Sequence, residues 1–269
     1  MKHVILAGAA LLSLAACANE EKANAAQETS ETKAPDDDSI QTGSIALDAI
    51  SKAILNPARS QEARDRDTGR KPAAVLRLAD IQPGQTVVDI ASSPDYYAPL
   101  LADVVGPNGE LIMIGPKRLE EFFPQALDAA DAYGDASDDD NIISLRMNLD
   151  EIALDTPVDR VLNILYYHDT VWSGVDRAKM NKAIFEALKP GGYYLIIDHA
   201  AKAGAGDAVT NDLHRIDPAV VRPEIEAAGF TLVKESDLLA NPDDPMEEGV
   251  FGPLRGKTNR FVMLFQKPE

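Results

Sequence analysis

Apolar runs and amphipathic stretches alternate along the chain from about residue 45 onward. The run VDRVLNILYY at residues 158–167 is nearly unbroken in its apolar character, as is typical of a strand buried on both faces. The stretch RAKMNKAIFEAL at residues 177–188 instead places Met180, Ile184 and Leu188 at helical spacing, and a Pro-Gly-Gly turn follows. Strands that alternate with helices predict an α/β fold, in which a mostly parallel, doubly wound sheet carries helices on both faces.

The same reading divides the rest of the chain into short elements. The predicted strands are TVVDIA (86–91), LIMIG (111–115), NIISLR (141–146), VDRVLNILYY, YYLIID (193–198), TLVKES (231–236) and RFVMLFQK (260–267). The predicted helices are 45–55, 71–81, 96–105, 118–134, 177–188 and 217–230, with Asp95 and Asp217 as candidate N-caps. Residues 56–70 are predicted to form a charged loop. The last two strands have no helix between them, which predicts an antiparallel strand at one edge of the sheet.

The N-terminus has the pattern of an exported lipoprotein. A short apolar run from Val4 to Ala16 follows Lys2 and is too short to span a bilayer, as in a secretory signal peptide. It ends in Leu-Ala-Ala-Cys17, which resembles the bacterial lipobox, in which the cysteine sulfur carries a diacylglycerol. The alternative is an ordinary signal peptide. We predict a signal peptide at residues 1–16, a flexible acidic tether at 17–42 and a folded domain at 43–269.

Charge and cysteine content limit the partners. Cys17 is the only cysteine, which excludes an intramolecular disulfide and a thiolate-rich metal site. Without Lys2 the chain has 26 − 1 = 25 basic and 44 acidic residues, a net charge of −19. We therefore expect no nucleic-acid partner, contact with a membrane only through the lipid anchor, and a small-molecule ligand. Ala18 after the cysteine resembles the sorting signal of Gram-negative outer-membrane lipoproteins, which implies a domain that faces the periplasm.

The order of elements resembles that of the class I S-adenosylmethionine-dependent methyltransferases over about residues 70–267. VVDI (87–90) resembles their first motif strand, and ALKPGGYYLIID (187–198) resembles the helix–turn–strand of a later motif. YYHD, LHRIDP, EAAGF and RGKTNRFVMLFQKP resemble a group of exported bacterial methyltransferase-like proteins. The resemblance implies a Rossmann-like, seven-stranded sheet with a C-terminal antiparallel hairpin, and S-adenosylmethionine as the cofactor.

The glycine-rich cofactor motif of that family is altered in VVDIASSPDYY (87–97). Asp89 matches its acidic residue, but Ala91, Ser93 and Asp95 stand where glycines let the backbone turn tightly and approach the cofactor. The next strand ends in Gly115, where the family has a carboxylate for the ribose. The loop residues that the resemblance assigns to the cofactor are Asp89, Ala91, Ser92, Ser93, Tyr96 and Tyr97. Either the loop binds the cofactor weakly, or the fold has lost it.

Polar side chains follow the fourth and fifth predicted strands. Because the carboxyl ends of parallel strands meet at one edge, His168, Asp169, Asp198, His199 and His214 are expected to share a rim. The catalytic candidates are His168, Asp169 and His199, with a histidine as general base and a carboxylate that orients it. Two alternatives remain: a divalent metal site built from His168, Asp198, His199 and His214, or loop residues that cap neighbouring backbone.

Two charged segments could complete this rim. RDRDTGR (64–70) carries Arg64, Arg66 and Arg70, which either fold over the pocket to bind an anion or form a solvated loop, and the composition favours the loop. The second segment, residues 240–258, is called the late loop here. It is long for a connection between two strands, and its Arg255 and Lys257 could reach an acidic ligand.

The leading hypothesis is a lipid-anchored, methyltransferase-like protein that transfers a methyl group from S-adenosylmethionine to an unknown acceptor. The first alternative is a non-catalytic ligand-binding or scaffold lipoprotein of the envelope that reuses the fold. The second is a metal-dependent enzyme at the same rim.

If Cys17 carries the lipid, Cys17→Ser is expected to move the protein almost completely from the membrane fraction to the soluble fraction, because several acyl chains anchor far better than one. Fractionation of cells with and without an inhibitor of the lipoprotein signal peptidase checks this. Membrane association that survives Cys17→Ser unchanged would contradict the lipoprotein interpretation.

Overall fold

The computed structural model describes residues 47–137 and 141–269. The predicted signal peptide, Cys17, the tether and the domain boundary at residue 43 lie outside these ranges and stay predictions. Within the described ranges, no helix combines the length and the apolar character needed to cross a bilayer.

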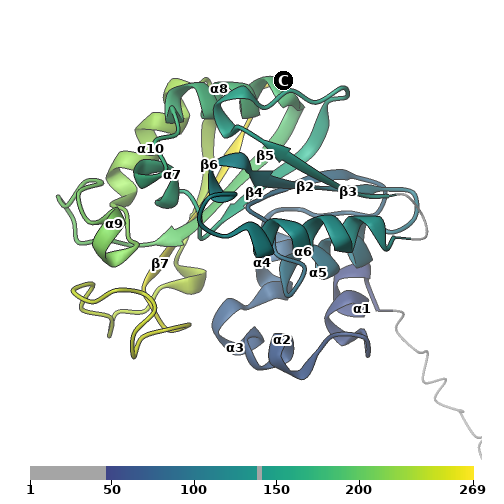
Figure 1. Ribbon diagram of the computed structural model, residues 1–269, viewed down its shortest axis with the longest axis horizontal. Helices are drawn as coiled ribbons and strands as arrows, with labels where there is room; N and C mark the ends of the chain where they lie inside the picture. The colour runs from purple at the N-terminus through teal and green to yellow at the C-terminus, as the bar shows by residue number, and fades with distance from the viewer. Residues whose placement is uncertain (1–46, 138–140) are drawn as a thin grey trace, which may run out of the picture. The chain divides into compact units, whose positions relative to one another are not determined.

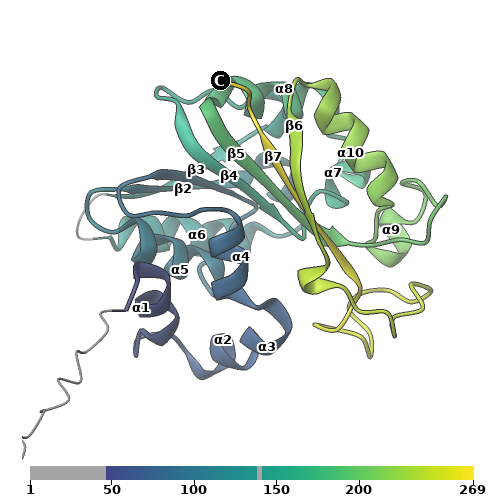
Figure 2. The same cartoon turned by 180° about the vertical axis from the view of Figure 1, so that it is seen from behind.

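The described residues form one seven-stranded sheet in the order β3-β2-β1-β4-β5-β7-β6. Its strands are β1 Thr86–Ile90, β2 Glu110–Pro116, β3 Ile142–Met147, β4 Val158–Ile164, β5 Leu188–His199, β6 Thr231–Ser236 and β7 Arg260–Gln266. The pairs from β3 to β5 are parallel, and β7 is antiparallel to both β5 and β6. The predicted fold class is confirmed. The antiparallel strand, however, lies one place in from the edge, because β7 inserts between β5 and β6 (Figures 1 and 2).

Helices cover both faces of this sheet (Figure 1). They are α1 Ala49–Leu55, α2 Gln61–Asp65, α3 Asp67–Arg70, α4 Pro72–Leu78, α5 Tyr97–Val105, α6 Pro124–Asp135, α7 Asp169–Trp172, α8 Arg177–Ala187, α9 Thr210–Leu213 and α10 Pro218–Ala227. Single 3₁₀ turns occur at Lys117–Leu119, Leu149–Glu151 and Asp237–Leu239. Buried side chains of α1, α4, α5 and α6 belong to one core, and those of α8 and α10 belong to the other.

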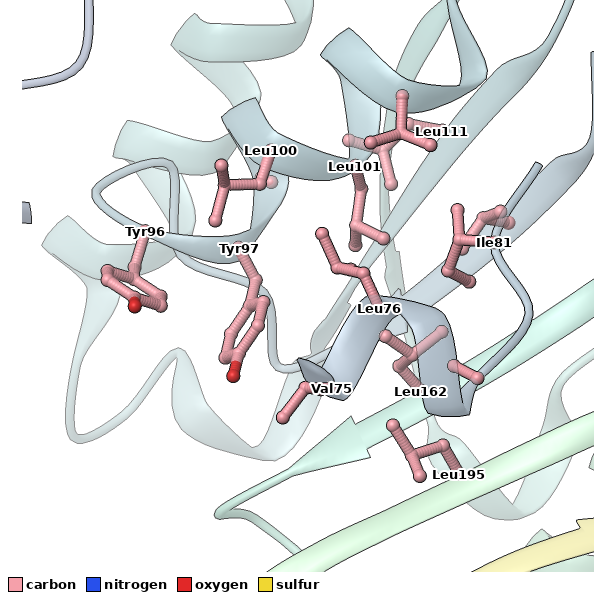
Figure 3. Packing of buried hydrophobic residues seen from close by; sticks show 14 of the residues in the cluster. Val75, Leu76, Ile81, Tyr96, Tyr97, Leu100, Leu101, Leu111, Leu162 and Leu195 are labelled. Carbon is pink, nitrogen blue, oxygen red and sulfur yellow. The ribbon is translucent and has the colours of Figure 1, made fainter. Parts of the chain in front are cut away.

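The alternation of side chains along the strands divides the apolar residues between the two cores. Val87 of β1 packs in the first core, whereas its neighbour Val88 packs in the second. Figure 3 shows the first core, where Leu76 of α4 and Leu101 of α5 lie over the sheet close to Leu162 of β4. Both faces of the central strands are therefore buried, as the unbroken apolar runs predicted.

Three local predictions were wrong. The predicted charged loop contains α2 and α3, and Ser60 caps α2 by accepting a hydrogen bond from the backbone N–H of Ala63. Asp95 does not cap α5, because its carboxylate faces Arg66 instead. The helix predicted from residue 118 is interrupted before Pro124, where the residue before a proline avoids the helical conformation.

A buried ion pair fixes the late loop. Arg215 and Asp244 have no exposed side-chain surface, and their atoms Nη1 and Oδ2 are 2.8 Å apart. Arg215 also donates to the carbonyl of Glu248, and the Asp244 carboxylate accepts the backbone N–H groups of Met246 and Asn259. The two side chains thus tie together backbone from both ends of the late loop.

Asp244→Asn is expected to lower the free energy of unfolding by about 3–5 kcal/mol, because it leaves the buried Arg215 guanidinium without its charge partner. Urea unfolding measures this loss. Glu226→Gln is the matched control, since its pair with Arg222 is exposed (49% and 38%) and should contribute less than about 1 kcal/mol. Equal losses in both variants would show that the Arg215–Asp244 pair does not hold the loop.

Candidate functional site

A cavity of about 600 Å³ lies at the carboxyl ends of β4 and β5, a size typical of small-molecule sites. Its walls come from three parts of the chain: the α2–α3 segment, the residues after β4 and at the end of β5, and the late loop with the start of β7. The lining residues are Asp65, Arg66, Thr68, Gly69, Arg70, Leu165, His168, Asp169, His199, Val250, Phe251, Arg255, Gly256, Lys257 and Arg260.

Asp198, at the end of β5, orients the histidines. Its buried carboxylate accepts the backbone N–H of His168 at 2.7 Å and that of His199 at 2.7 Å. The same carboxylate lies 2.7 Å from Nδ1 of the His168 ring. Because β4 and β5 are neighbours in the sheet, the turn after β4 comes within reach of this one side chain, which fixes the position of His168.

Three side-chain nitrogen atoms lie close to one carboxylate oxygen, Oδ1 of Asp169, which is the first residue of α7. Its Oδ1 lies 3.0 Å from Nε2 of His168 and 3.1 Å from Nδ1 of His214. The same oxygen accepts the indole N–H of Trp172 at 2.6 Å. The donor atoms of His168, Asp169 and His214 all lie within 4.8 Å of one another.

The structure brings together a set of possible metal ligands that differs from the predicted one. His168 and His214 share Asp169, which the sequence reasoning had placed among the catalytic residues. Asp198 is on the far side of the His168 ring, at Nδ1, and the centre of the His199 ring is 5.9 Å from that of His168.

Two of the predicted catalytic residues differ in protonation. Burial opposes a charge on His168, but the charge of Asp198 and the hydrogen bonds from Asp169 and Asp198 raise the pKa of His168 to about 10. Burial lowers the pKa of His199 well below its ordinary value, and the charges of His168 and Arg260 lower it further. His199 therefore stays neutral near pH 7 and, with its Nδ1 held 2.7 Å from Thr258 Oγ1, is in the state that a general base requires.

Five basic residues surround the same cavity: Arg66, Arg70, Arg255, Lys257 and Arg260. Among the described residues, only Arg66 of these has a carboxylate within salt-bridge distance, that of Asp95 at 3.0 Å. The Arg260 side chain is buried and donates to the backbone carbonyl of Gly69 at 2.8 Å, so its charge is not balanced by an acid. The cavity is basic although the chain as a whole is strongly acidic.

The segment at residues 64–70 does not behave as a solvated loop. Arg66 and Arg70 stack on the ring of Tyr96, with 4.9 and 4.6 Å between guanidinium carbon and ring centre. The Tyr96 hydroxyl donates to Asp67 at 2.8 Å, and Asp67 in turn pairs with the buried Arg59. The predicted alternative, in which the arginines fold over the pocket, agrees with this arrangement for Arg66 and Arg70.

The cofactor-like loop after β1 surrounds a second, smaller cavity of about 160 Å³, which shares Arg70 and Leu165 with the first. Ala91 has φ +54°, the left-handed conformation that favours glycine, at a position where the resemblance expects a glycine. The side chains fill the loop themselves: Ser92 donates to Asp89 at 2.6 Å, and Ser93 donates to Asp95. Burial raises the pKa of Asp89 to about 7.

The position to which the resemblance assigns a ribose-binding carboxylate, Gly115, is closely packed. A Cβ atom added at Gly115 would lie 2.7 Å from Cδ2 of Leu127. An acidic side chain there would have to displace Leu127 of α6 before it could face a ligand.

The sequence reasoning missed Arg260 and Thr258 as site residues. Because β7 is antiparallel to β5, its first residue lies beside the last residue of β5, and Arg260 pairs with His199. The antiparallel strand predicted from the sequence implied this: the start of such a strand meets the carboxyl ends of its parallel neighbours.

Solved structures support the fold. No protein-family model matches the chain. An S-adenosylmethionine-dependent methyltransferase from Aquifex aeolicus is similar, with a TM-score of 0.53, 19% identity, and coverage of 81% of this chain and 98% of that one. The N-methyltransferase NodS from Bradyrhizobium japonicum has a TM-score of 0.50 and 14% identity, with 76% and 97% covered. The arsenic(III) S-adenosylmethionine methyltransferase from Chlamydomonas reinhardtii has a TM-score of 0.50 and 12% identity, and the match covers 83% of this chain and 75% of that one. Residues 47–137 and 141–269 therefore have the class I methyltransferase fold.

Proposed function

We propose that the chain binds a small anionic molecule in the basic cavity, and that it is a ligand-binding protein of the envelope built on a methyltransferase fold. The ligand would carry a carboxylate or phosphate group, whose oxygens match the guanidinium geometry. The lipobox and the tether support a lipid-anchored protein that presents this cavity to the periplasm.

The observation that carries the proposal is the group of cations without acidic partners. Arg70, Arg255, Lys257 and Arg260 line one cavity, and among the described residues none has a carboxylate within 4.0 Å. Arg260 is buried and Arg70 is half-buried, so holding these like charges together costs free energy that a bound anion offsets, and the exposed Arg255 and Lys257 add to the positive field. The neutral His199 ring lies beside these groups as a further hydrogen-bonding partner.

The alternative, methyl transfer from S-adenosylmethionine, requires a cofactor that the loop residues do not fit. The cavity beside the loop has about 160 Å³, less than the roughly 300–1,000 Å³ of ordinary ligand sites, so a nucleoside would have to extend past Arg70 and Leu165 into the larger cavity. Asp95 stands where the resemblance expects a glycine, and its side chain is held 3.0 Å from Arg66 in an ion pair beside the loop. Gly115 supplies no ribose ligand. These observations favour anion binding over methyl transfer.

Calorimetric titration of the full chain with inorganic phosphate and with succinate tests the proposal. At least one probe is expected to bind at millimolar concentration or below, and its affinity should fall as salt rises. Arg70→Gln and Arg260→Gln should each weaken binding roughly ten- to a hundredfold, because each removes a charged hydrogen bond worth about 1.5–3 kcal/mol.

Arg222→Gln is the control, since this exposed arginine of α10 pairs with Glu226 and does not line the cavity. S-adenosylmethionine and its demethylated product, titrated in parallel, should not bind. Tight binding of S-adenosylmethionine, or an equal effect of all three arginine variants, would contradict the proposal.

The Asp89 carboxyl gives a separate test of the loop. Burial raises the pKa of Asp89 from 3.8 to about 7 in the folded protein. As the pH rises from 4 to 7, the carboxyl group loses its proton in the unfolded chain but keeps it in the folded protein. The free energy of unfolding therefore falls as the pH rises through this range. At about 1.4 kcal/mol per pKa unit, the loss is about 4 kcal/mol at pH 7 and above. Asp89→Asn should remove it, so the variant should gain stability relative to the wild type from pH 4 to pH 7.

Urea unfolding at several pH values measures this difference. Glu121→Gln, at an exposed position of the chain, should show no such trend. A constant difference between Asp89→Asn and the wild type across this range would show that the carboxyl ionises normally.

A further inference from the structure

We propose that His168, Asp169 and His214 bind one divalent transition-metal ion at the wall of the basic cavity. The proposal stands apart from anion binding, because the three residues form a site by their own geometry and the ion is tested without any anionic ligand.

The crowding around Asp169 Oδ1 points to an ion. Three nitrogen atoms, from His168, His214 and Trp172, lie 2.6–3.1 Å from this single oxygen. Two of these atoms are imidazole nitrogens from separate segments of the chain, and both face the same carboxylate oxygen, as neighbouring ligands of one cation do. A cation bound by the oxygen and the two imidazoles accounts for this convergence, and it leaves the Trp172 N–H as a hydrogen bond to the same oxygen.

The separations agree with neighbouring positions in a coordination shell. Bonds of about 2.0–2.2 Å to nitrogen and oxygen place adjacent ligands about 3.3–3.6 Å apart in a tetrahedral shell and about 2.8–3.1 Å apart at the 90° angles of an octahedral one. Asp169 Oδ1 is 3.0 Å from His168 Nε2 and 3.1 Å from His214 Nδ1, and the full set lies within 4.8 Å. The His214 side chain retains 27% of its exposure and has room to adjust to an ion, whereas the His168 side chain is buried.

The surroundings supply the support that metal-binding histidines usually have. Nδ1 of His168 lies 2.7 Å from the buried carboxylate of Asp198, so that nitrogen keeps its proton, and a divalent ion at Nε2 displaces the proton held there in the metal-free protein. The His214 ring packs edge-on against Phe251, with 4.8 Å between ring centres. Both ligand rings are thus held by groups outside the triad.

Two imidazoles and one carboxylate favour Zn²⁺, Fe²⁺ or a similar ion over Mg²⁺ and Ca²⁺, which prefer oxygen ligands. Three protein ligands leave at least one coordination position open. His168 and Asp169 line the basic cavity, so a water or an anionic group held there could complete the shell. This arrangement is the open kind found in catalytic rather than structural metal sites.

The test uses the full chain, purified without a histidine tag, stripped with a chelator and titrated with Zn²⁺ in a non-coordinating buffer. One ion per chain is expected, by calorimetry and by elemental analysis after dialysis. His214→Ala and Asp169→Asn should each weaken Zn²⁺ binding by more than about a hundredfold, since even outer partners of a metal site change affinity 10- to 100-fold.

His199→Gln is the matched control, a histidine on the same cavity outside the triad, and it should keep its Zn²⁺ affinity within about tenfold. Thermal unfolding of each variant without metal confirms that it is folded. A folded wild type that binds no Zn²⁺ at micromolar concentration overturns the proposal. Binding that ignores His214→Ala and Asp169→Asn, or that His199→Gln abolishes equally, overturns the assignment of these ligands.

Discussion

The candidate site depends on the buried carboxylate of Asp198. It sits at the end of β5 with no exposed surface, so its charge is stabilised by hydrogen bonds rather than by water. It accepts two backbone N–H groups, from His168 and His199, and it contacts the His168 ring. These contacts join the turn after β4 to the end of β5, and they direct the free edge of the His168 ring toward Asp169. Thr258 then fixes the His199 ring, so the carboxylate sets the backbone at both histidines and the ring of His168.

A second buried charge completes the cavity from the other side. The Arg215–Asp244 pair holds the late loop, and that loop brings Arg255 and Lys257 to a cavity whose opposite wall carries Arg66 and Arg70. The sheet therefore supplies the fixed histidine side of the site, and segments far apart in the sequence supply the cations. The chain is acidic as a whole, yet the cations of the cavity are mostly held by groups other than carboxylates. The Gly69 carbonyl holds Arg260, the Tyr96 ring holds Arg70, and the buried Arg215–Asp244 pair holds the loop that carries Arg255 and Lys257.

The fold was largely predictable because its strands are short apolar runs and its longer helices have clear periodicity. The position of β7 between β5 and β6 was not, since periodicity reports which face a residue occupies and not which strand it pairs with. The helices α2 and α3 have five and four residues, too few for a periodic signal, and long-range contacts such as that of Tyr96 with Asp67 stabilise them. In the site, strand ends predicted the histidine rim, but the sharing of Asp169 by His168 and His214 depends on how two loops fold together.

In the loop after β1, the backbone conformation is required by the sheet and does not depend on a bound cofactor. Ala91 keeps a positive φ of 54°, a conformation that costs a non-glycine residue about 1–2 kcal/mol. Its backbone N–H donates to the carbonyl of Ile114 at 2.8 Å, and so continues the pairing of β1 with β2. That bond holds the turn in place whether or not a nucleoside lies against it. The sheet therefore imposes the backbone path, and Ser93 and Asp95 can stand where the resemblance expects glycines without a change of fold. The sheet maintains the fold, and loop contacts maintain the cavity, so the two can change independently. The likeness to methyltransferases therefore extends to the architecture. The chemistry has to be inferred from the residues of the cavity.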